Sequence, residues 1–172
     1  MKNTLLISYK TLTQNSEVPE NISPAVILPL IKDVQEMHVE PILGTALFEK
    51  IQNDIEAGTL AGNYKDLVTD YIAPVLIYGV LTDLVFTGNY RFSPAGIITH
   101  TPGGAQSSVL NAEFKDLQKI SDFYKSKIVW RAGKLTDYIS KNVSNFPEYS
   151  EFQSCKDAPQ KETYQVGIYL GK

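Results

Sequence analysis

The feature that most constrains this chain is a proline, Pro41, set between two helical patterns that follow each other almost directly. Proline disfavours the helical region for the residue before it, while its own fixed φ suits the first turn of a new helix. We therefore expect one amphipathic helix to end just before a hinge at Glu40–Pro41 and a second to begin at Pro41 and pack back on the first. The apolar positions of the second helix are Ile42, Leu43, Ala46, Leu47, Ile51 and Ile55. This pattern is architectural and has no features of a catalytic site.

The bulk composition is that of one globular domain. The 172 residues are 43% apolar and 20% charged, so large-scale disorder is not expected. The formal net charge of −3 gives no reason to expect a general nucleic-acid or membrane binder. Cys155 is the only cysteine, which excludes an intramolecular disulfide and favours a reduced setting. We expect no signal peptide, and the apolar segment 72–86 is too short and interrupted to span a bilayer.

Charge is unevenly distributed along the chain. Residues 17–83 hold eleven acidic residues against three lysines, whereas residues 84–142 hold eight basic residues against four acids. One interpretation is two solvated helix faces. The other is that acidic and basic surfaces of neighbouring copies meet head to tail, as a ring requires.

The periodicity predicts a mainly α fold, a helical bundle with one long C-terminal helix and short terminal strands. Ser23 and Pro24 supply a cap and first turn for a helix that runs to about His38. Pro29 either kinks that helix or marks the start of its regular part. Gly58 is placed to end the second helix in a left-handed conformation. The expected divisions are residues 1–20, with a short strand or extended arm at 4–10 and a linker after it, the helical domain (21–142) and a tail (143–172).

A third helix is expected to be capped by Asn63, with a break or kink at Pro74. The segment 75–85 is apolar on nearly all sides, which is typical of a helix at the centre of a bundle. Asp83 lies within this segment. It is either a buried functional acid or a residue at the exposed edge.

Residues 87–108 contain four glycines and two prolines around a β-rich island at 96–100. We expect a projecting hairpin or extended loop, because loops this long in a compact domain are usually functional or disordered. After it, Ser107 or Ser108 caps a helix that runs to about Asn142. Its apolar stripe is Leu110, Phe114, Leu117, Ile120, Phe123 or Tyr124, Ile128, Ala132, Leu135 and Ile139. Its outer face carries Lys115, Lys119, Lys125, Lys127, Arg131, Lys134 and Lys141.

No motif for phosphate binding, dinucleotide binding, zinc hydrolysis or serine hydrolysis is present. Glu36, His38 and Glu40 alternate, and on a helix such residues point apart, so we expect no metal site there and place His38 at a helix C-terminus. Asp66 and Asp70 share a face that we expect to be solvated. The basic face of the long helix suits DNA as a passive lining, although interleaved aspartates favour i,i+4 pairing instead.

The chain resembles the head-to-tail adaptor, or connector ring, proteins of tailed bacteriophages, particularly a form from phages of the crAss-like type and related prophages. The resemblance covers residues 22–147. The residues that carry it are Gln35, Glu36, His38, Val39, Pro41, Ile42, Leu43, Gly44, Thr45, Leu47 and Phe48. Further support comes from Tyr64, Leu67, Pro74, the Gly96 loop, Phe146 and Pro147.

The resemblance implies a virion protein, assembled in the host cytoplasm, that forms a ring of about twelve copies between the portal and the next neck or tail protein. Such a ring extends the DNA channel, performs no chemistry, and needs no cofactor, metal or membrane. Its fold signature here is Gln35, His38, Pro41, Leu43, Gly44, Leu47 and Phe48. The loop expected to bind the portal or a neighbour carries Tyr90, Phe92, Pro94, Gly96, Ile97, Ile98 and Pro102.

The segment 163–172 alternates like a strand and has to pair with another strand. It pairs either within its own chain or with the neighbouring subunit through Tyr164, Val166, Ile168 and Leu170. Three other functions stay open. They are another neck or tail-completion ring, a small helical enzyme or ligand-binding protein, and a DNA-binding regulator with salt-dependent duplex binding.

Overall fold

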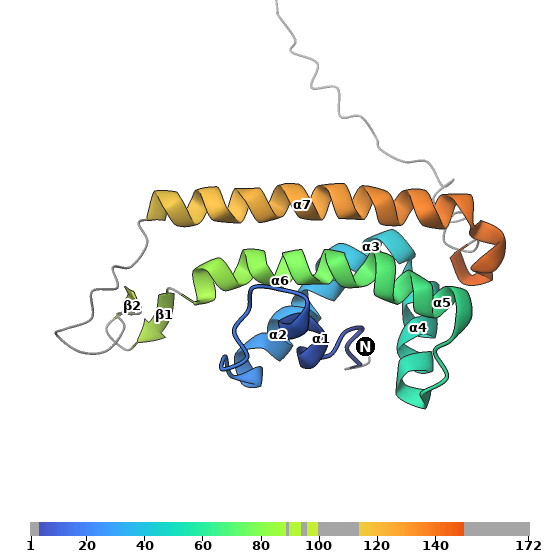
Figure 1. Ribbon diagram of the computed structural model, residues 1–172, viewed down its shortest axis with the longest axis horizontal. Coiled ribbons are helices and arrows are strands. Elements are labelled where there is room, and N and C mark those ends of the chain that lie inside the picture. Colours follow the sequence, from blue (N-terminus) through green and yellow to red (C-terminus); the bar gives the residue numbers. More distant parts are fainter. Residues whose placement is uncertain (1–3, 89, 94–95, 100–113, 150–172) are drawn as a thin grey trace, which may run out of the picture.

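The computed structural model describes residues 4–88, 90–93, 96–99 and 114–149, and these are mainly helical, as expected (Figure 1). One long helix lies along one side of α6, and the shorter elements lie on the other side. The elements in chain order are α1 (Tyr9–Gln14), α2 (Pro24–Val34), η1 (Gln35–Val39), α3 (Glu40–Leu43), α4 (Thr45–Ala57), α5 (Gly62–Asp66), η2 (Leu67–Ile72), α6 (Ala73–Thr87), β1 (Tyr90–Ser93), β2 (Gly96–Thr99), α7 (Phe114–Lys141) and η3 (Val143–Asn145).

The helix that carries Pro41 does not end where the sequence predicts. α2, η1 and α3 follow one another without a break, and η1 is a π-turn in which the Glu40 amide donates to the Gln35 carbonyl. This wider turn accommodates the proline ring without ending the helix. The predicted hinge at Glu40–Pro41 is therefore wrong. The chain turns at Gly44, whose φ of 75° suits glycine.

A second π-turn, η2, precedes Pro74 in the same way, so of the break or kink expected there, the break is absent. Asn63 lies inside α5 and does not cap it, because the helix begins at Gly62. The result is one helix from Gly62 to Thr87, with 26 residues, which is long and apolar enough to cross a membrane. The expectation of a segment too short to span a bilayer is thus wrong on length. More than half of its most apolar window, 56%, is buried inside the protein, as in a core helix.

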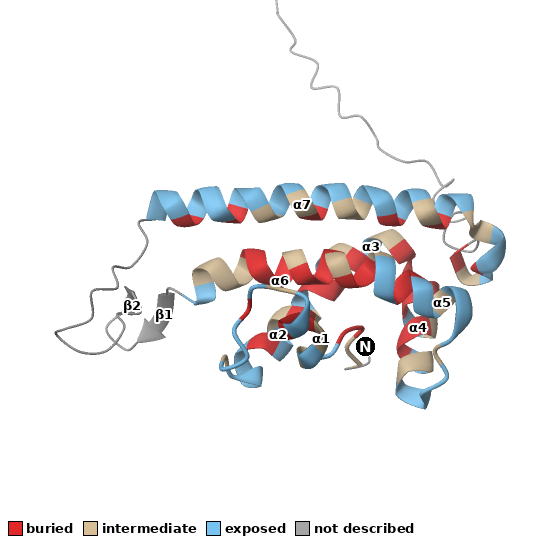
Figure 2. Cartoon of the chain, in the orientation of Figure 1, coloured by how far each residue is buried: buried red, intermediate tan, exposed pale blue. Residues whose placement is uncertain are grey.

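The core forms around α6, which is buried along most of its length, as the sequence predicts (Figure 2). α2 crosses it at very short range. A Cβ added to Gly79 would lie 2.2 Å from Cγ1 of Val34, so only glycine allows this approach. The boundaries expected at Ser23, Pro24 and Gly58 are confirmed, and α2 continues through Pro29.

Of the two forms expected for residues 4–10, a short strand or an extended arm, the strand does not form, and α1 begins at Tyr9. The Ser8 hydroxyl accepts a 3.0 Å hydrogen bond from the Thr11 amide and caps α1. The Leu6 amide donates to the buried side-chain oxygen of Gln35 at 3.1 Å. A side chain, and not a neighbouring strand, therefore satisfies this backbone.

α7 buries only one side, and the rest of its surface is exposed (Figure 2). Of the two alternatives for the stripe, Tyr124 turns toward the core and Phe123 is exposed. Phe114 and Ile120, expected in the stripe, are also exposed. The buried residues of α7 are Leu117, Ser121, Ile128, Leu135 and Ile139.

Beyond α7 the chain turns back toward α5. Phe146 is fully buried, and its ring packs edge-on against Tyr64 with centroids 5.4 Å apart. At the opposite end of α7, β1 and β2 pair antiparallel with Phe92 opposite Ile97. This hairpin, one of the two forms expected for the loop, lies beyond the ends of α6 and α7 (Figure 1).

Candidate functional site

α7 carries an exposed stripe beside its buried one. Trp130 and Phe123 are each 55% exposed, and Ile120 is 43% exposed. Their spacing of three and four residues places them on one flank together with Lys127 and Lys134. We call Phe123, Lys127, Trp130 and Lys134 the aromatic–basic flank.

The cations of this flank lie over its rings. Lys127 Nζ is 5.1 Å from the ring centroid of Phe123, and Lys134 Nζ is 5.6 Å from that of Trp130. Arg131 Cζ lies 4.8 Å from the centroid of the same tryptophan. Cation–π contacts at exposed sites contribute only about 0.5–1 kcal/mol each, so a partner can displace them.

Ion pairs occupy two of the cations elsewhere on α7. Lys119 binds Asp116 at 2.9 Å, and Lys125 lies 3.5 Å from Asp122. None of the ion pairs between described residues includes Lys127 or Lys134, the two lysines of the flank. The flank therefore combines large apolar rings with positive charge that an acidic partner would neutralise.

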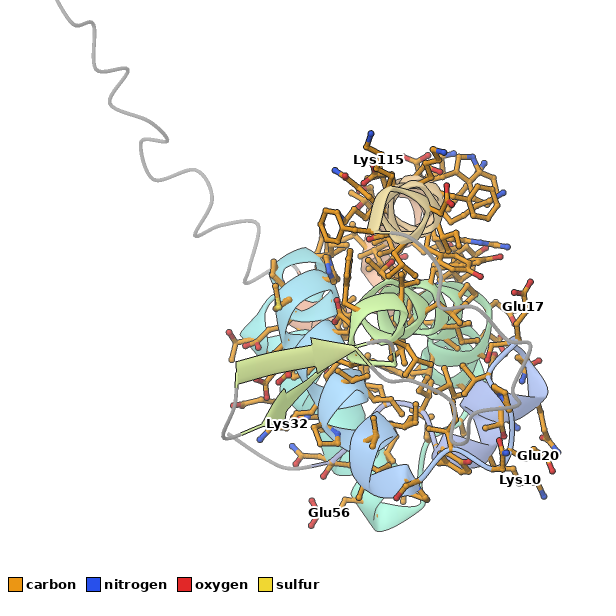
Figure 3. The ribbon with its side chains drawn as sticks, turned by 90° about the vertical axis from the view of Figure 1, so that its left-hand side faces the viewer. Lys10, Glu17, Glu20, Lys32, Glu56 and Lys115 are labelled. Atoms are coloured by element: carbon orange, nitrogen blue, oxygen red, sulfur yellow. The ribbon has the colours of Figure 1, made fainter. Side chains whose placement is uncertain are left out.

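A groove runs beneath this flank, between α7 and the N-terminal segment, with α6 as its floor. Three adjoining cavities of about 470, 550 and 370 Å³ all include Tyr78 in their walls. Phe123 and Lys127 line it from α7, and Asn15 and Glu17 line it from the segment opposite. In Figure 3, which looks along α7, that segment and the labelled Glu17 lie to the right of α6.

Tyr124 connects the two walls of this groove. Its hydroxyl donates a 3.1 Å hydrogen bond to the carboxylate of Glu17. Burial raises the pKa of Tyr124, and the hydrogen bond and charge of Glu17 raise it further. The hydroxyl therefore stays protonated at neutral pH and holds the linker after α1 against α7.

The other flank of α7 faces a half-buried carboxyl, Asp83. Burial raises the pKa of Asp83, His38 and Lys125 lower it, and Asp33 raises it. The expectation that His38 ends a helix is wrong, because the helix continues through η1 into α3. Within the described ranges, no three His, Cys, Asp or Glu residues come close enough to hold a metal ion.

An exposed acidic surface surrounds Met37, on the opposite side of the molecule from the groove. The Met37 side chain is 67% exposed, Asp33 is exposed, and Glu36 and Glu40 are partly exposed. In Figure 3, η1 and α3 lie to the left of α6, whereas Glu17 lies to the right. We call Asp33, Glu36, Met37 and Glu40 the acidic stripe.

The residues expected as a fold signature have structural positions. Gln35 is fully buried, and its side-chain amide donates to the Thr4 carbonyl at 3.2 Å. Of the others, Leu43, Gly44, Leu47 and Phe48 are buried, His38 is half-buried and Pro41 is exposed.

The expected docking loop is described only in part. Tyr90 and Phe92 lie in β1, and Gly96, Ile97 and Ile98 lie in β2. Pro94 and Pro102 of that loop lie outside the described residues. So do Cys155 and the whole of the expected C-terminal strand, with Tyr164, Val166, Ile168 and Leu170.

Residues 39–159 match a protein family described as a family of unknown function (DUF6712). The chain belongs to DUF6712. The region shared with DUF6712 includes α4 through η3, and therefore the whole aromatic–basic flank, whereas α1 and α2 precede it. No curated protein and no solved structure shows a significant match to the chain.

For this DUF6712 protein, sequence reasoning missed the aromatic–basic flank and the groove. One available signal was the spacing of Phe123, Lys127, Trp130 and Lys134, a second helical stripe offset from the buried one. The groove had no such signal, because it depends on the position of α1 beside α6.

Proposed function

We propose that this protein is a structural subunit of a ring in the neck of a tailed bacteriophage. The ring, of about twelve copies, joins the portal to the next neck or tail protein and extends the DNA channel. The subunit is assembled into the virion in the host cytoplasm and performs no catalysis. The observation that carries this proposal is the exposed aromatic–basic flank of α7, a surface suited to permanent contact with another protein.

The position of a second, acidic surface supports the proposal. The aromatic–basic flank borders the groove on the side of Glu17, whereas η1 and α3, which carry most of the acidic stripe, lie on the other side of α6 (Figure 3). Contacts between two different surfaces of identical subunits are heterologous, and they close into a ring when the rotation between subunits allows. A single two-fold contact would instead use one surface on both copies.

The hairpin supports a docking role for one end of the subunit. It lies beyond the helical body at the end where α6 finishes and α7 begins (Figure 1). Its edges are available for pairing, because β1 and β2 form a sheet of only two strands among the described residues. We assign this end to the contact with the portal.

α7 provides length for a channel wall. Its 28 residues span about 42 Å at 1.5 Å per residue. The helix carries seven basic residues and three aspartates, so any contact with DNA is electrostatic and independent of base sequence.

The test is light scattering combined with negative-stain imaging over a range of protein concentrations. Closed rings of about a dozen copies are the expected result. A protein that stays monomeric alone is then mixed with the portal protein. Failure to assemble on the portal as well would overturn the proposal.

The groove favours a second candidate, a small helical ligand-binding protein. Its cavities of about 370–550 Å³ fall within the range of small-molecule sites, and Arg131 and Lys127 line them. A rise in melting temperature with a saturating small anion, lost in Arg131→Ala, would support this candidate against the ring.

A further inference from the structure

We propose that the aromatic–basic flank of one copy binds the acidic stripe of a second copy, with Trp130 packed against Met37. This inference rests on the proposed ring and names the contact that closes it. The partner is a second copy of this chain because the molecule itself presents both complementary surfaces.

The flank has a defined charge pattern. Lys127 precedes Trp130 by three residues, and Lys134 follows it by four. All three lie on one face of α7, so an exposed ring stands between two cations about 10 Å apart along the helix.

The stripe has the complementary pattern in the reverse order. Asp33 precedes Met37 by four residues, and Glu40 follows it by three. Two helices that run antiparallel therefore place Lys134 opposite Asp33 and Lys127 on the side of Glu40, which the π-turn η1 rotates away from the line through Asp33 and Met37. If the helices ran parallel, Lys127 would lie three residues from Trp130 but Asp33 four residues from Met37. The charges would then not lie opposite each other.

The choice of the acidic stripe over the other acidic surfaces rests on exposed apolar area. Glu49 and Glu56 are also exposed, on α4, but among the described residues of α4 no large hydrophobic side chain is exposed. The stripe combines its carboxylates with Met37, and the exposed side chains of Val26 and Leu28 lie on the same helix. Aromatic residues and methionine are enriched in interface cores.

The two surfaces on one subunit do not compete. The flank borders the groove on the side of Glu17, whereas the stripe lies on the side of α6 that carries η1 and α3 (Figure 3). Each copy can bind one neighbour through each surface, so growth continues until the ring closes.

A charge-reversal experiment tests the pairing in the full chain. Lys134→Glu and Asp33→Lys each place like charges opposite each other, so each should raise the dissociation constant for self-association at least about tenfold. The double variant restores the opposite charges and should return to within about threefold of wild type. Glu40→Lys combined with Lys134→Glu is the mismatched control and should not recover. Glu49→Lys is the control for a remote charge and should change nothing.

A mixing experiment separates this inference from the ring itself. Trp130→Glu keeps an intact stripe and Met37→Lys keeps an intact flank, so the mixture should give a heterodimer that stops there. Sedimentation velocity measures the species, and circular dichroism checks that each variant is folded.

The outcomes are distinct. Rings that form equally well in every variant overturn this contact and leave the ring proposal standing. A heterodimer in the mixture, together with wild-type protein that forms open-ended assemblies and no closed rings, supports the contact and overturns the ring. No association in wild type or in the mixture overturns this contact, and failure of the wild type to assemble on the portal protein as well overturns the ring.

Discussion

The hydroxyl of Tyr64 donates a 2.9 Å hydrogen bond to the carboxylate of Glu148, 84 positions away in the sequence. The bond joins α5, at the start of the continuous helix from Gly62 to Thr87, to the segment that follows α7. The Tyr64 ring also packs edge-on against the buried Phe146. The end of the described chain is therefore fastened to the helical body by both polar and apolar contacts.

Tyr64→Phe should lower the free energy of unfolding by about 1 kcal/mol at pH 7, because it removes the hydrogen bond and keeps the ring. Burial first, and then the bond to Glu148, raise the pKa of Tyr64 from 10.0 to about 12. The folded state thus favours the protonated hydroxyl. This stabilisation is complete below pH 10 and is lost as the pH rises toward 12.

Urea unfolding of wild type and Tyr64→Phe at pH 7 and between pH 10 and 12 measures both effects. Glu148→Gln, which keeps an acceptor oxygen, is the matched control and should lose less stability than Tyr64→Phe. Equal stability of wild type and the phenylalanine variant at pH 7 would contradict the importance of this bond.

Gly79→Ala should destabilise the protein by about 1–3 kcal/mol, because the new methyl group would overlap Val34. Val34→Ala in the same chain should recover part of that loss, which a double-mutant cycle in urea measures. The control is Gly133→Ala on α7, where nothing lies within 4 Å. That change should stabilise by about 0.5–1 kcal/mol, since alanine favours helix. Similar changes in the free energy of unfolding for Gly79→Ala and Gly133→Ala would contradict this prediction. They would show that helix propensity, and not packing against Val34, determines the stability of both variants.

Helix boundaries set by local chemistry could be predicted from the sequence. Ser23 and Pro24 define the start of α2, and Gly58 defines the end of α4, because caps depend on neighbouring residues alone. The apolar run at 75–85 likewise indicated a central helix correctly. These features require no knowledge of distant contacts.

The errors have a common physical cause. Proline at 41 and 74 predicts a break only if the preceding turn is α-helical, and the sequence does not reveal a π-turn. The exposure of Phe123 and Trp130 depends on how α7 is rotated on α6. The groove depends on the placement of α1, which tertiary packing decides.

Asp83→Asn should raise the melting temperature at pH 7, because burial disfavours the charged carboxylate. The folded pKa of Asp83 lies above its ordinary value of 3.8. The favourable contribution of the protonated form is complete below pH 3.8 and is lost as the pH rises through the folded pKa. The advantage of the asparagine variant should therefore be absent at acid pH and grow toward neutrality.

Thermal melts from pH 3 to pH 7 measure this difference. Asp66→Asn, at an exposed position on α5, is the matched control and should show no such growth. An asparagine variant of Asp83 that is less stable than wild type at pH 7 would mean that attraction to His38 and Lys125 outweighs burial.

Deletion of residues 94–105 should leave the monomer folded and abolish docking of the ring to the portal. The deleted range includes β2, and the hairpin lies beyond the ends of α6 and α7, so the helical core does not require it. Circular dichroism should show unchanged helicity, and co-sedimentation with the portal protein should be lost. Reduced helicity or a broader thermal transition would show that this segment supports the core.

The two π-turns set the rotational phase of everything that follows them. Each adds one residue to a turn, and one residue corresponds to about 100° of rotation around a helix. Each wide turn absorbs its extra residue, so the residues after it keep their faces. If η2 kept its residues but tightened to α-helical turns, Gly79 would rotate away from Val34 and a bulkier side chain would face α2. The angular position of each face thus depends on residue count and turn width together. A sequence that lost one residue of a π-turn could close that turn to an α-helical one and keep the same surface outward, whereas a sequence that kept the residue in a tight turn would present a different one.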